Sequence, residues 1–345
     1  MDEKRLTRAL DRALERITQE TGLVGGVVDV IRGGQIVYTY HYGYSDRENQ
    51  LPMTQETLFD VASTSKAWTV MLAAQAIDDG LLTWDGPIRD VIPEFEMLDP
   101  YVGAHLSVRD LASHRSGLPG HDFLREKIPG DRENLMRKLA FLEMNCGFRS
   151  KYQYNNHMFI LLGYLVERAR GGMLWEDQIR KYIAGPLGVD PIRFRGVKED
   201  MEGIHPALPY CSNGYETSRC GYATNYHSAP CGGIRISMAN MAKWIAAMSR
   251  GGALPGGGRH GDDGGFRCSL QFLPPEAPLP CAVLHPPAAD FDWLPSGSLP
   301  VLRPKRGGMS PGDAEDAPAA FLRRVFLPGA PVSFLRGCSF PLRSP

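Results

Sequence analysis

The sequence predicts an α+β protein in which a mixed antiparallel sheet is flanked by helices and lies beside a helical region. Residues 23–45 alternate apolar and polar side chains around the Gly33-Gly34 turn, which is typical of a β-hairpin. Between Leu58 and about Ile245, apolar residues recur at helical spacing, and loops rich in Gly, Pro and Asp separate the periodic segments. We expect helices at residues 65–79, 107–112, 132–144, 156–170, 175–184 and 237–249.

Composition and charge exclude several classes of protein. The formal net charge is −1, so the sequence lacks the excess of basic residues that would indicate a nucleic-acid partner. The first twenty residues are highly charged, and their apolar residues form one stripe, at Leu6, Leu10, Leu14 and Ile17. This pattern indicates an amphipathic helix rather than an export signal, and no later segment reaches the apolar length of a membrane span.

The cysteines bear on the cellular location of the protein. Seven is an odd number, and without an export signal we interpret them as reduced thiols in the cytoplasm. No Cys-x-x-Cys pair occurs, so a zinc site is not predicted. We expect no metal and no cofactor.

Composition changes sharply after residue 250. Residues 251–345 hold 16 of the 27 prolines and contain no Ile, Thr, Tyr or Asn. Strands are built from β-branched and aromatic residues and exclude proline from central positions, so C-terminal strands are doubtful here. We therefore predict a catalytic domain at 1–250, incomplete at its C-terminal end, and an atypical Pro/Gly-rich tail at 251–345, poorly ordered or foreign to the domain.

The first chemical signal is Ser63-x-x-Lys66, at the start of the helix expected over 65–79. Residues three apart share one helix face. The simple interpretation is an N-cap serine and a surface lysine. The alternative is a nucleophilic serine whose proton passes to the lysine, which requires a lysine pKa well below the ordinary value of about 10.4.

A second signal, Tyr154-x-Asn156, comes directly before the apolar run of 156–170. Alone, it would indicate packing and a helix cap. Together with Ser63 and Lys66 it describes parts of a serine acyl-transfer site, in which a tyrosine relays a proton and an asparagine orients a substrate carbonyl. The backbone N–H of Ser63 would then serve as one oxyanion donor.

Six segments in this order resemble the serine β-lactamase and penicillin-binding-protein superfamily, nearest its class C β-lactamase-related esterases, D-aminopeptidases and transacylases. They are GGVVDVIRGGQIVYTYHYGYSD, ETLFDVASTSKAWT, HLSVRDLASHRSGLPGHD, YQYNNHMFILLGYLVE, YIAGPLGV and APCGGIRISMANMAKWI. The resemblance covers roughly residues 20–250 and implies a β-lactamase/transpeptidase-like fold. It implies that Ser63 is the nucleophile, Lys66 its base, Tyr154 a second base or proton shuttle, and Asn156 a substrate-orienting group.

One family motif is missing. The family carries Lys-Thr-Gly or His-x-Gly on a strand near its C-terminus, which supplies a second oxyanion N–H. After residue 250 the sequence has no His-x-Gly, and the single Lys-x-Gly of the chain, Lys305-Arg306-Gly307, follows a proline. Because loss of one oxyanion donor costs on the order of a hundred- to a thousandfold in rate, activity is expected to be impaired if nothing replaces it.

Other residues carry weaker signals. His227 and Ser228 precede a Pro-Cys-Gly-Gly turn and are candidates to border the substrate pocket. His114, His121 and Asp122 fit no standard metal-ligand spacing, and structural roles are favoured for them.

The favoured function is a cytoplasmic serine hydrolase or acyl transferase that acts on a small ester or amide through a Ser63 acyl-enzyme, with no nucleic-acid or membrane partner. The alternative is a catalytically impaired or inactive relative that serves as a binding or scaffold module. A third hypothesis is a chain that does not fold stably, because a sheet without its C-terminal strands exposes its edges.

Overall fold

The structure is a computed structural model that describes residues 3–254, apart from residues 22, 33, 123–129, 198–203, 205, 213–216, 222–224, 250, 251 and 253. The described residues belong to two compact units. The first comes from 3–57 and 206–221, and the second from 58–204 and 225–254. The predicted tail at 251–345 lies almost wholly outside the described residues, and its boundary with a catalytic domain stays a prediction.

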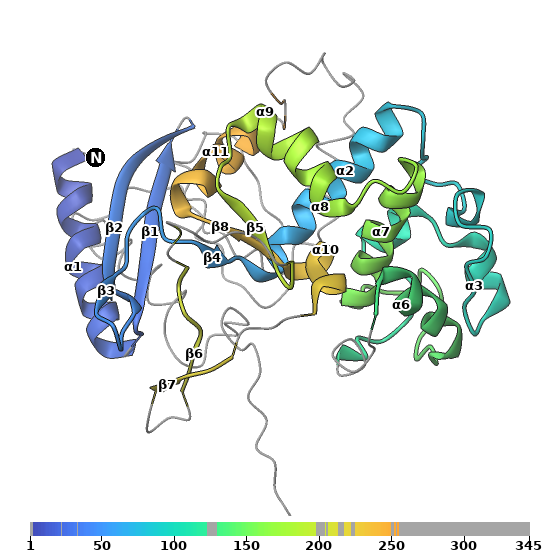
Figure 1. The fold of residues 1–345 in the computed structure, drawn as a ribbon, viewed down its shortest axis with the longest axis horizontal. Helices are drawn as coiled ribbons and strands as arrows, with labels where there is room; N and C mark the ends of the chain where they lie inside the picture. The colour runs from blue at the N-terminus through green and yellow to red at the C-terminus, as the bar shows by residue number, and fades with distance from the viewer. Residues whose placement is uncertain are drawn as a thin grey trace, which may run out of the picture. The chain divides into compact units, whose positions relative to one another are not determined.

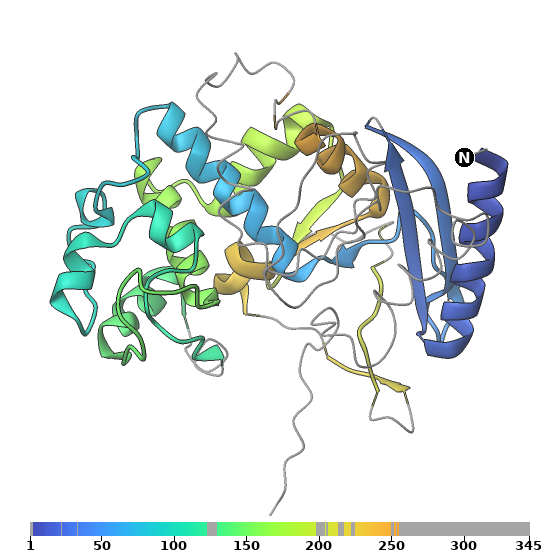
Figure 2. The ribbon, with the colours of Figure 1, turned by 180° about the vertical axis from the view of Figure 1, so that it is seen from behind.

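The first unit is built on the predicted hairpin. Strands β1 (Gly25–Arg32) and β2 (Gln35–Asp46) pair antiparallel, and β3 (Leu51–Pro52) extends the sheet from β2. Helix α1 (Glu3–Thr21) lies along this hairpin (Figure 2). The apolar stripe of the helix explains the packing, because Leu10, Leu14 and Ile17 are buried against β-strand side chains.

A second hairpin in this unit corrects the prediction of reduced thiols. Strands β6 (Tyr210–Ser212) and β7 (Thr217–Arg219) pair antiparallel, and Cys211 forms a disulfide with Cys220. Cys146 and Cys231 are free thiols. The prediction was wrong for Cys211 and Cys220 because the hairpin, which brings them together, is too short to show in the sequence pattern. The expected cytoplasmic location was inferred partly from reduced thiols, and it stays a prediction.

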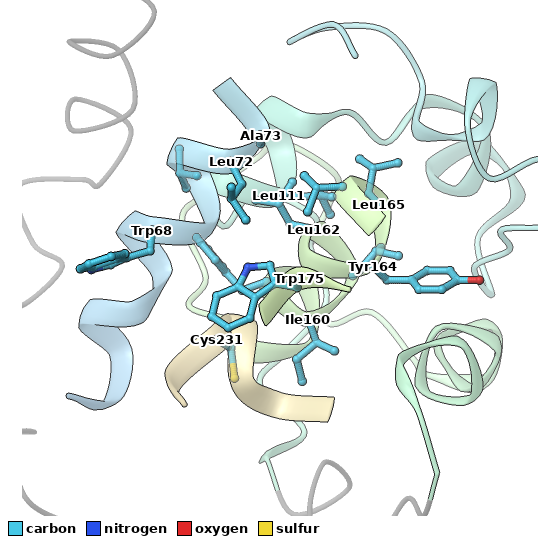
Figure 3. Close-up of a cluster of buried hydrophobic side chains, with 14 of the residues drawn as sticks. Trp68, Leu72, Ala73, Leu111, Ile160, Leu162, Tyr164, Leu165, Trp175 and Cys231 are labelled. Atoms are coloured by element: carbon cyan, nitrogen blue, oxygen red, sulfur yellow. The ribbon is translucent and has the colours of Figure 1, made fainter. Parts of the chain in front are cut away.

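The second unit has a helical core. Helices α2 (Ser65–Asp78), α7 (Asn156–Ala169), α8 (Trp175–Ile179) and α10 (Ala229–Gly232) lie next to one another (Figure 1). Figure 3 shows Leu72 of α2 and Leu162 of α7 pointing into the space between their helices, beside the indole of Trp175. All three side chains are fully buried. The apolar runs of the sequence thus become the two central helices.

A small antiparallel sheet lies in the same unit. Strand β8 (Ile234–Ile236) is central, with β4 (Phe59–Asp60) on one side and β5 (Ile192–Phe194) on the other. Helix α11 (Met238–Ser249) follows β8, and its Trp244 stacks on Trp68 of α2 with ring centroids 4.2 Å apart. Strand β4 leads directly into the Ser63 segment, so this sheet fixes the entrance of α2.

The remaining described elements of the second unit are short. They are η1 (Ala62–Thr64), η2 (Ile88–Asp90), α3 (Pro100–His105), α4 (Val108–Ala112), α6 (Arg132–Lys138), η3 (Leu139–Phe141), η4 (Arg180–Ala184), α9 (Gly185–Leu187) and η5 (Tyr226–Ser228).

The helix expected over 132–144 is shorter than predicted. It ends at Lys138 and is followed by a single 3₁₀ turn, after which the chain is extended at Leu142. There Asn145 N–H donates to the carbonyl of Gly117, so a bond to another loop replaces a helical one. Within the described ranges, no helix has both the length and the apolar content needed to cross a lipid bilayer.

Candidate active site

Ser63 lies in the turn that joins strand β4 to helix α2. The preceding residue, Ala62, has a φ of +47°, a left-handed conformation that is uncommon for alanine. Val61 N–H donates to the carbonyl of Ile234 at 2.9 Å, which ties the turn to β8. This sharp change of direction places Ser63 in the 3₁₀ turn η1, one turn before Lys66 on α2.

Lys66 is buried and surrounded by oxygen atoms. Only 3% of the surface of this residue is exposed to solvent. Nζ lies 3.1 Å from Ser63 Oγ and donates to Asn156 Oδ1 at 2.7 Å and to the backbone carbonyl of Cys231 at 2.6 Å. The aromatic rings of Tyr154 and Phe159 also lie near it, with centroids 4.8 and 5.4 Å from Nζ. The lysine is therefore not the surface charge of the simpler interpretation.

Tyr154 is the second side chain in hydrogen-bond contact with Ser63 Oγ. Its Oη lies 2.6 Å from Ser63 Oγ, and either hydroxyl is able to donate. The tyrosine stands two residues before α7, and its side chain is partly open to solvent because the residue is 37% exposed. A substrate that reaches Ser63 would thus meet the phenol at the same place.

Asn156 is the first residue of α7 and connects Lys66 to a carboxylate. Its Oδ1 accepts from Lys66, and its Nδ2 donates to Asp122 Oδ1 at 2.7 Å. The adjacent Asn155 caps the helix by accepting from Met158 N–H. The structure brings Ser63, Lys66, Tyr154 and Asn156 together at one place.

The carbonyl of Cys231 is held against Lys66 by side chains of α2. Ser65 Oγ accepts from Ile234 N–H at 3.1 Å, and Thr69 Oγ1 donates to the carbonyl of Pro230 at 2.7 Å. On the other side, α7 approaches Pro230 so closely that a Cβ on Gly163 would come within 2.3 Å of the proline ring. Only glycine fits at position 163.

His114 lies behind the tyrosine and is neutral. Its Nδ1 accepts from Asn155 N–H at 3.1 Å, so the proton of the neutral ring is on Nε2. Burial and the nearby charge of Lys66 lower the pKa of His114 from 6.5 to about 3. The ring packs against Tyr154 and Phe159, with centroids 4.6 and 4.9 Å apart. These contacts indicate that His114 supports the position of the Tyr154 ring by packing against it.

His227 and Ser228 do not contact Ser63 through any described hydrogen bond. Both are buried in η5, where Ser228 Oγ donates to the carbonyl of Asn225 at 2.8 Å. The carbonyl of His227 accepts from Arg132 Nε at 3.2 Å. These contacts hold the turn that precedes Cys231, and a role in substrate binding stays a prediction for both residues.

Sequence reasoning missed two contributors to the site. The Cys231 carbonyl carries no signal, because a backbone acceptor exists at every residue and only the fold selects one. Asp122 carried a weak signal as the polar residue that ends the stretch resembling the family's HxSGLP motif, but it was weighed only as a metal ligand. No group of three or more metal-ligating side chains occurs among the residues that the structure describes.

A two-unit α+β chain with a serine, a buried lysine and a tyrosine in hydrogen-bond contact has the architecture of the serine β-lactamase class. The model of the beta-lactamase family matches residues 10–263, and the chain belongs to this family.

Named relatives have several activities. The chain is 27% identical over 244 residues to unguisins hydrolase ungD of Aspergillus violaceofuscus, covering 65% of this chain and 42% of that protein. It is 30% identical over 229 residues to esterase EstB of Burkholderia gladioli, covering 61% and 56%. The crystal structure of a class C beta lactamase from Rhodobacter sphaeroides superposes with a TM-score of 0.59 at 25% identity, covering 76% of this chain and 69% of that one.

These comparisons confirm the predicted family and the predicted β-lactamase/transpeptidase-like fold. The chain spans about half the length of the curated relatives it matches. The relatives named above are hydrolases by name, and their names specify different substrates.

Proposed function

We propose that the protein is a serine hydrolase or acyl transferase that acts on a small ester or amide through an acyl-enzyme on Ser63. The observation that carries this proposal is the buried amine of Lys66, 3.1 Å from Ser63 Oγ. A serine hydroxyl is a weak nucleophile and needs an adjacent base. Burial disfavours the charged form of an amine, which supports Lys66 as that base.

Lys66 Nζ is able to donate to all three oxygen atoms around it as an ammonium group, and the same contacts accommodate the neutral amine that acts as the base. A neutral lysine has two N–H groups and one lone pair. Asn156 Oδ1 and the Cys231 carbonyl, at 2.7 and 2.6 Å, accept the two N–H groups. The lone pair is left for the longer contact to Ser63, whose hydroxyl then donates to Nζ.

The reaction follows from these positions. The Ser63 proton passes to Lys66 while Oγ attacks the acyl carbon, and the carbonyl oxygen becomes an oxyanion near the Ser63 N–H. The intermediate collapses, the acyl–oxygen or acyl–nitrogen bond breaks, and the leaving group takes a proton that Tyr154 relays from Lys66. Water or another nucleophile then attacks the acyl carbon and gives its proton to Lys66, directly or through Tyr154. The bond between Ser63 Oγ and the acyl carbon breaks, and Oγ takes a proton back from the same groups.

The substrate class is proposed from the chemistry of the site and from the relatives. A relative named as an esterase and one named as an unguisins hydrolase support acyl chemistry on esters or amides. Nothing at Ser63 selects between water and a second substrate as the acceptor, so hydrolysis and acyl transfer are both included. Asn156 is proposed to orient the substrate carbonyl when a substrate displaces part of its present contacts.

The alternative is a catalytically impaired or inactive relative that acts as a binding or scaffold module. Its motivation is that the sequence after residue 250 contains neither Lys-Thr-Gly nor His-x-Gly. The segment with Lys305-Arg306-Gly307 lies outside the described residues, so impairment stays a prediction.

Labelling by a fluorescent fluorophosphonate and by a fluorescent β-lactam tests the proposal on the full chain. Wild type is expected to label on Ser63 and to lose the label in Ser63→Ala. Lys66→Met removes the base and is expected to slow labelling about a hundredfold or more. Ser150→Ala and Lys243→Met are matched controls from the same unit. Ser150 Oγ donates to the carbonyl of Gly147, Lys243 Nζ donates to the carbonyl of Gly188 and to Asn240 Oδ1, and none of these partners belongs to the candidate site. Equal labelling of wild type and Ser63→Ala would refute the catalytic role and favour the binding module.

A further inference from the structure

The side-chain amide of Asn156 contacts two different groups, one through its oxygen atom and the other through its nitrogen atom. Lys66 Nζ donates to Oδ1 at 2.7 Å, and Asp122 Oδ1 accepts from Nδ2 at 2.7 Å. An ionised carboxylate only accepts hydrogen bonds. With Asp122 in place, the amide nitrogen must therefore point to Asp122, and the amide oxygen must point to Lys66.

Independent contacts hold Asp122 in front of Asn156. The segment 118–122 is bound by the two residues that flank Asn156 at the start of α7. Asn155 Nδ2 donates to two backbone carbonyls of this segment, at 2.9 and 2.7 Å, and His157 Nε2 lies 3.1 Å from a third. The position of Asp122 thus does not depend on its own bond to Asn156.

The orientation of this amide decides where the lone pair of a neutral Lys66 points. In the observed orientation, the lysine donates to Asn156 Oδ1 and to the Cys231 carbonyl, and its third position faces Ser63 Oγ. The ammonium form donates to Oγ there, and the neutral form directs its lone pair there. In the reversed orientation, an Nδ2–H would face Nζ and would compete with the serine hydroxyl for that lone pair. The reversed amide would also deprive the ammonium form of one acceptor.

We propose that Asp122 is a positioning residue, which fixes the Asn156 amide so that the Lys66 lone pair is directed at Ser63. This inference rests on the proposed acyl-enzyme function. Asp122 does not touch the reacting atoms and acts only through Asn156.

The test compares two substitutions at Asp122 by the rate of fluorophosphonate labelling. Asp122→Ala removes the acceptor and lets the amide reverse, so labelling is expected to slow about tenfold or more, the equivalent of one lost hydrogen bond to a charged group. Asp122→Asn has nearly the same shape and keeps a carbonyl acceptor, so its labelling rate is expected to stay within about threefold of wild type. Asp85→Ala is the matched control, because Asp85 is an exposed carboxylate of the same unit that pairs with Arg109.

The pH–rate profile separates this role from a merely structural one. Because a reversed amide disfavours the ammonium form of Lys66, the ascending limb of the profile is expected at lower pH in Asp122→Ala, with a lower plateau. A simple loss of folded protein would lower the rate equally at every pH. Thermal unfolding of each variant shows the folded fraction directly.

The outcomes are distinct. Slow labelling and a shifted profile in Asp122→Ala, together with near-normal Asp122→Asn, would support the proposal. Normal labelling in Asp122→Ala would refute the positioning role and leave the proposed function intact. Equal losses in both variants would show that the charge matters rather than the amide orientation, and would refute it as well. If wild type labels no faster than Ser63→Ala, the proposed function and this inference both fail.

Discussion

Ser63 Oγ lies 2.6 Å from the hydroxyl of Tyr154, a shorter contact than the 3.1 Å that separates it from Lys66 Nζ. The two partners come from different elements, since Lys66 is on α2 and Tyr154 precedes α7. One serine hydroxyl therefore faces two groups able to exchange protons with it. This arrangement allows one partner to take the serine proton while the other delivers a proton to the leaving group.

Tyr154→Phe is expected to slow acylation about a hundredfold or more, because it removes the hydroxyl that we propose as the proton relay. The ring keeps its packing against His114 and its position beside Lys66 Nζ, at 4.6 and 4.8 Å. Since the residue is 37% exposed, we expect the free energy of unfolding to change by less than about 0.5 kcal/mol. Stopped-flow acylation and denaturant unfolding measure the two quantities.

Tyr101→Phe serves as the control for this change. Tyr101 is 63% exposed, and its ring stacks on His105, far from the serine along the chain. Its acylation rate should equal that of wild type. An acylation rate for Tyr154→Phe within threefold of wild type would contradict a proton-relay role.

The central helices and the first hairpin were predictable because their signals are local. The apolar spacing around Leu72 and Leu162 indicates helices whatever lies outside them, and the Gly33-Gly34 turn marks the hairpin. Strands β4, β5 and β8 were missed since two or three residues show no alternation, and only tertiary contacts define them.

Ser63 and Lys66 could be named from the sequence because three-residue spacing on a helix brings two side chains together. Tyr154 and Asn156 needed the family resemblance, since nothing local says which helix entrance faces Ser63. Asp122 and the Cys231 carbonyl depend on long-range packing alone. The disulfide of Cys211 with Cys220 was missed for the same reason.

His114 is expected to make the protein sensitive to acid. The folded state lowers its pKa to about 3, whereas an unfolded chain has a histidine pKa near 6.5. Between these values the unfolded state binds more protons than the folded state, so the free energy of unfolding falls as the pH falls. The loss should approach about 1.4 kcal/mol for each pH unit below 6.5.

His114→Asn is expected to remove this slope. Asparagine keeps an acceptor for Asn155 N–H and tolerates the φ of +56° at this position, but it does not titrate. Loss of the ring lowers stability by a constant amount, while the pH dependence becomes shallower than that of wild type. Urea unfolding at pH 7, 6 and 5 measures both effects, with exposed His105→Asn as the control. Parallel curves for wild type and His114→Asn would show that His114 is not held neutral.

Arg132 binds two buried carboxylates beneath the turn that leads to Cys231. It pairs with Glu167 and with Glu176, the latter at 2.5 Å, and all three residues are buried. Burial raises the pKa of Glu167, and the charge of Arg132 opposes this rise. The guanidinium also donates to the carbonyl of His227 at 3.2 Å. The cluster of Arg132, Glu167 and Glu176 therefore supports the turn that leads to Cys231, although these three residues are not part of the candidate site.

Arg132→Met is expected to lower the free energy of unfolding by about 3 to 5 kcal/mol at pH 7, because it leaves two carboxylates buried without a counter-charge. The loss should shrink toward pH 5, where protonation relieves the uncompensated charge. Denaturant unfolding at the two pH values measures this difference. Arg137→Met is the control, since its i,i+4 pair with Glu133 is exposed to solvent and is therefore expected to contribute little to stability. If Arg132→Met costs no more than Arg137→Met, the cluster does not support the turn, and the Cys231 carbonyl must be held by Ser65 and Thr69 alone.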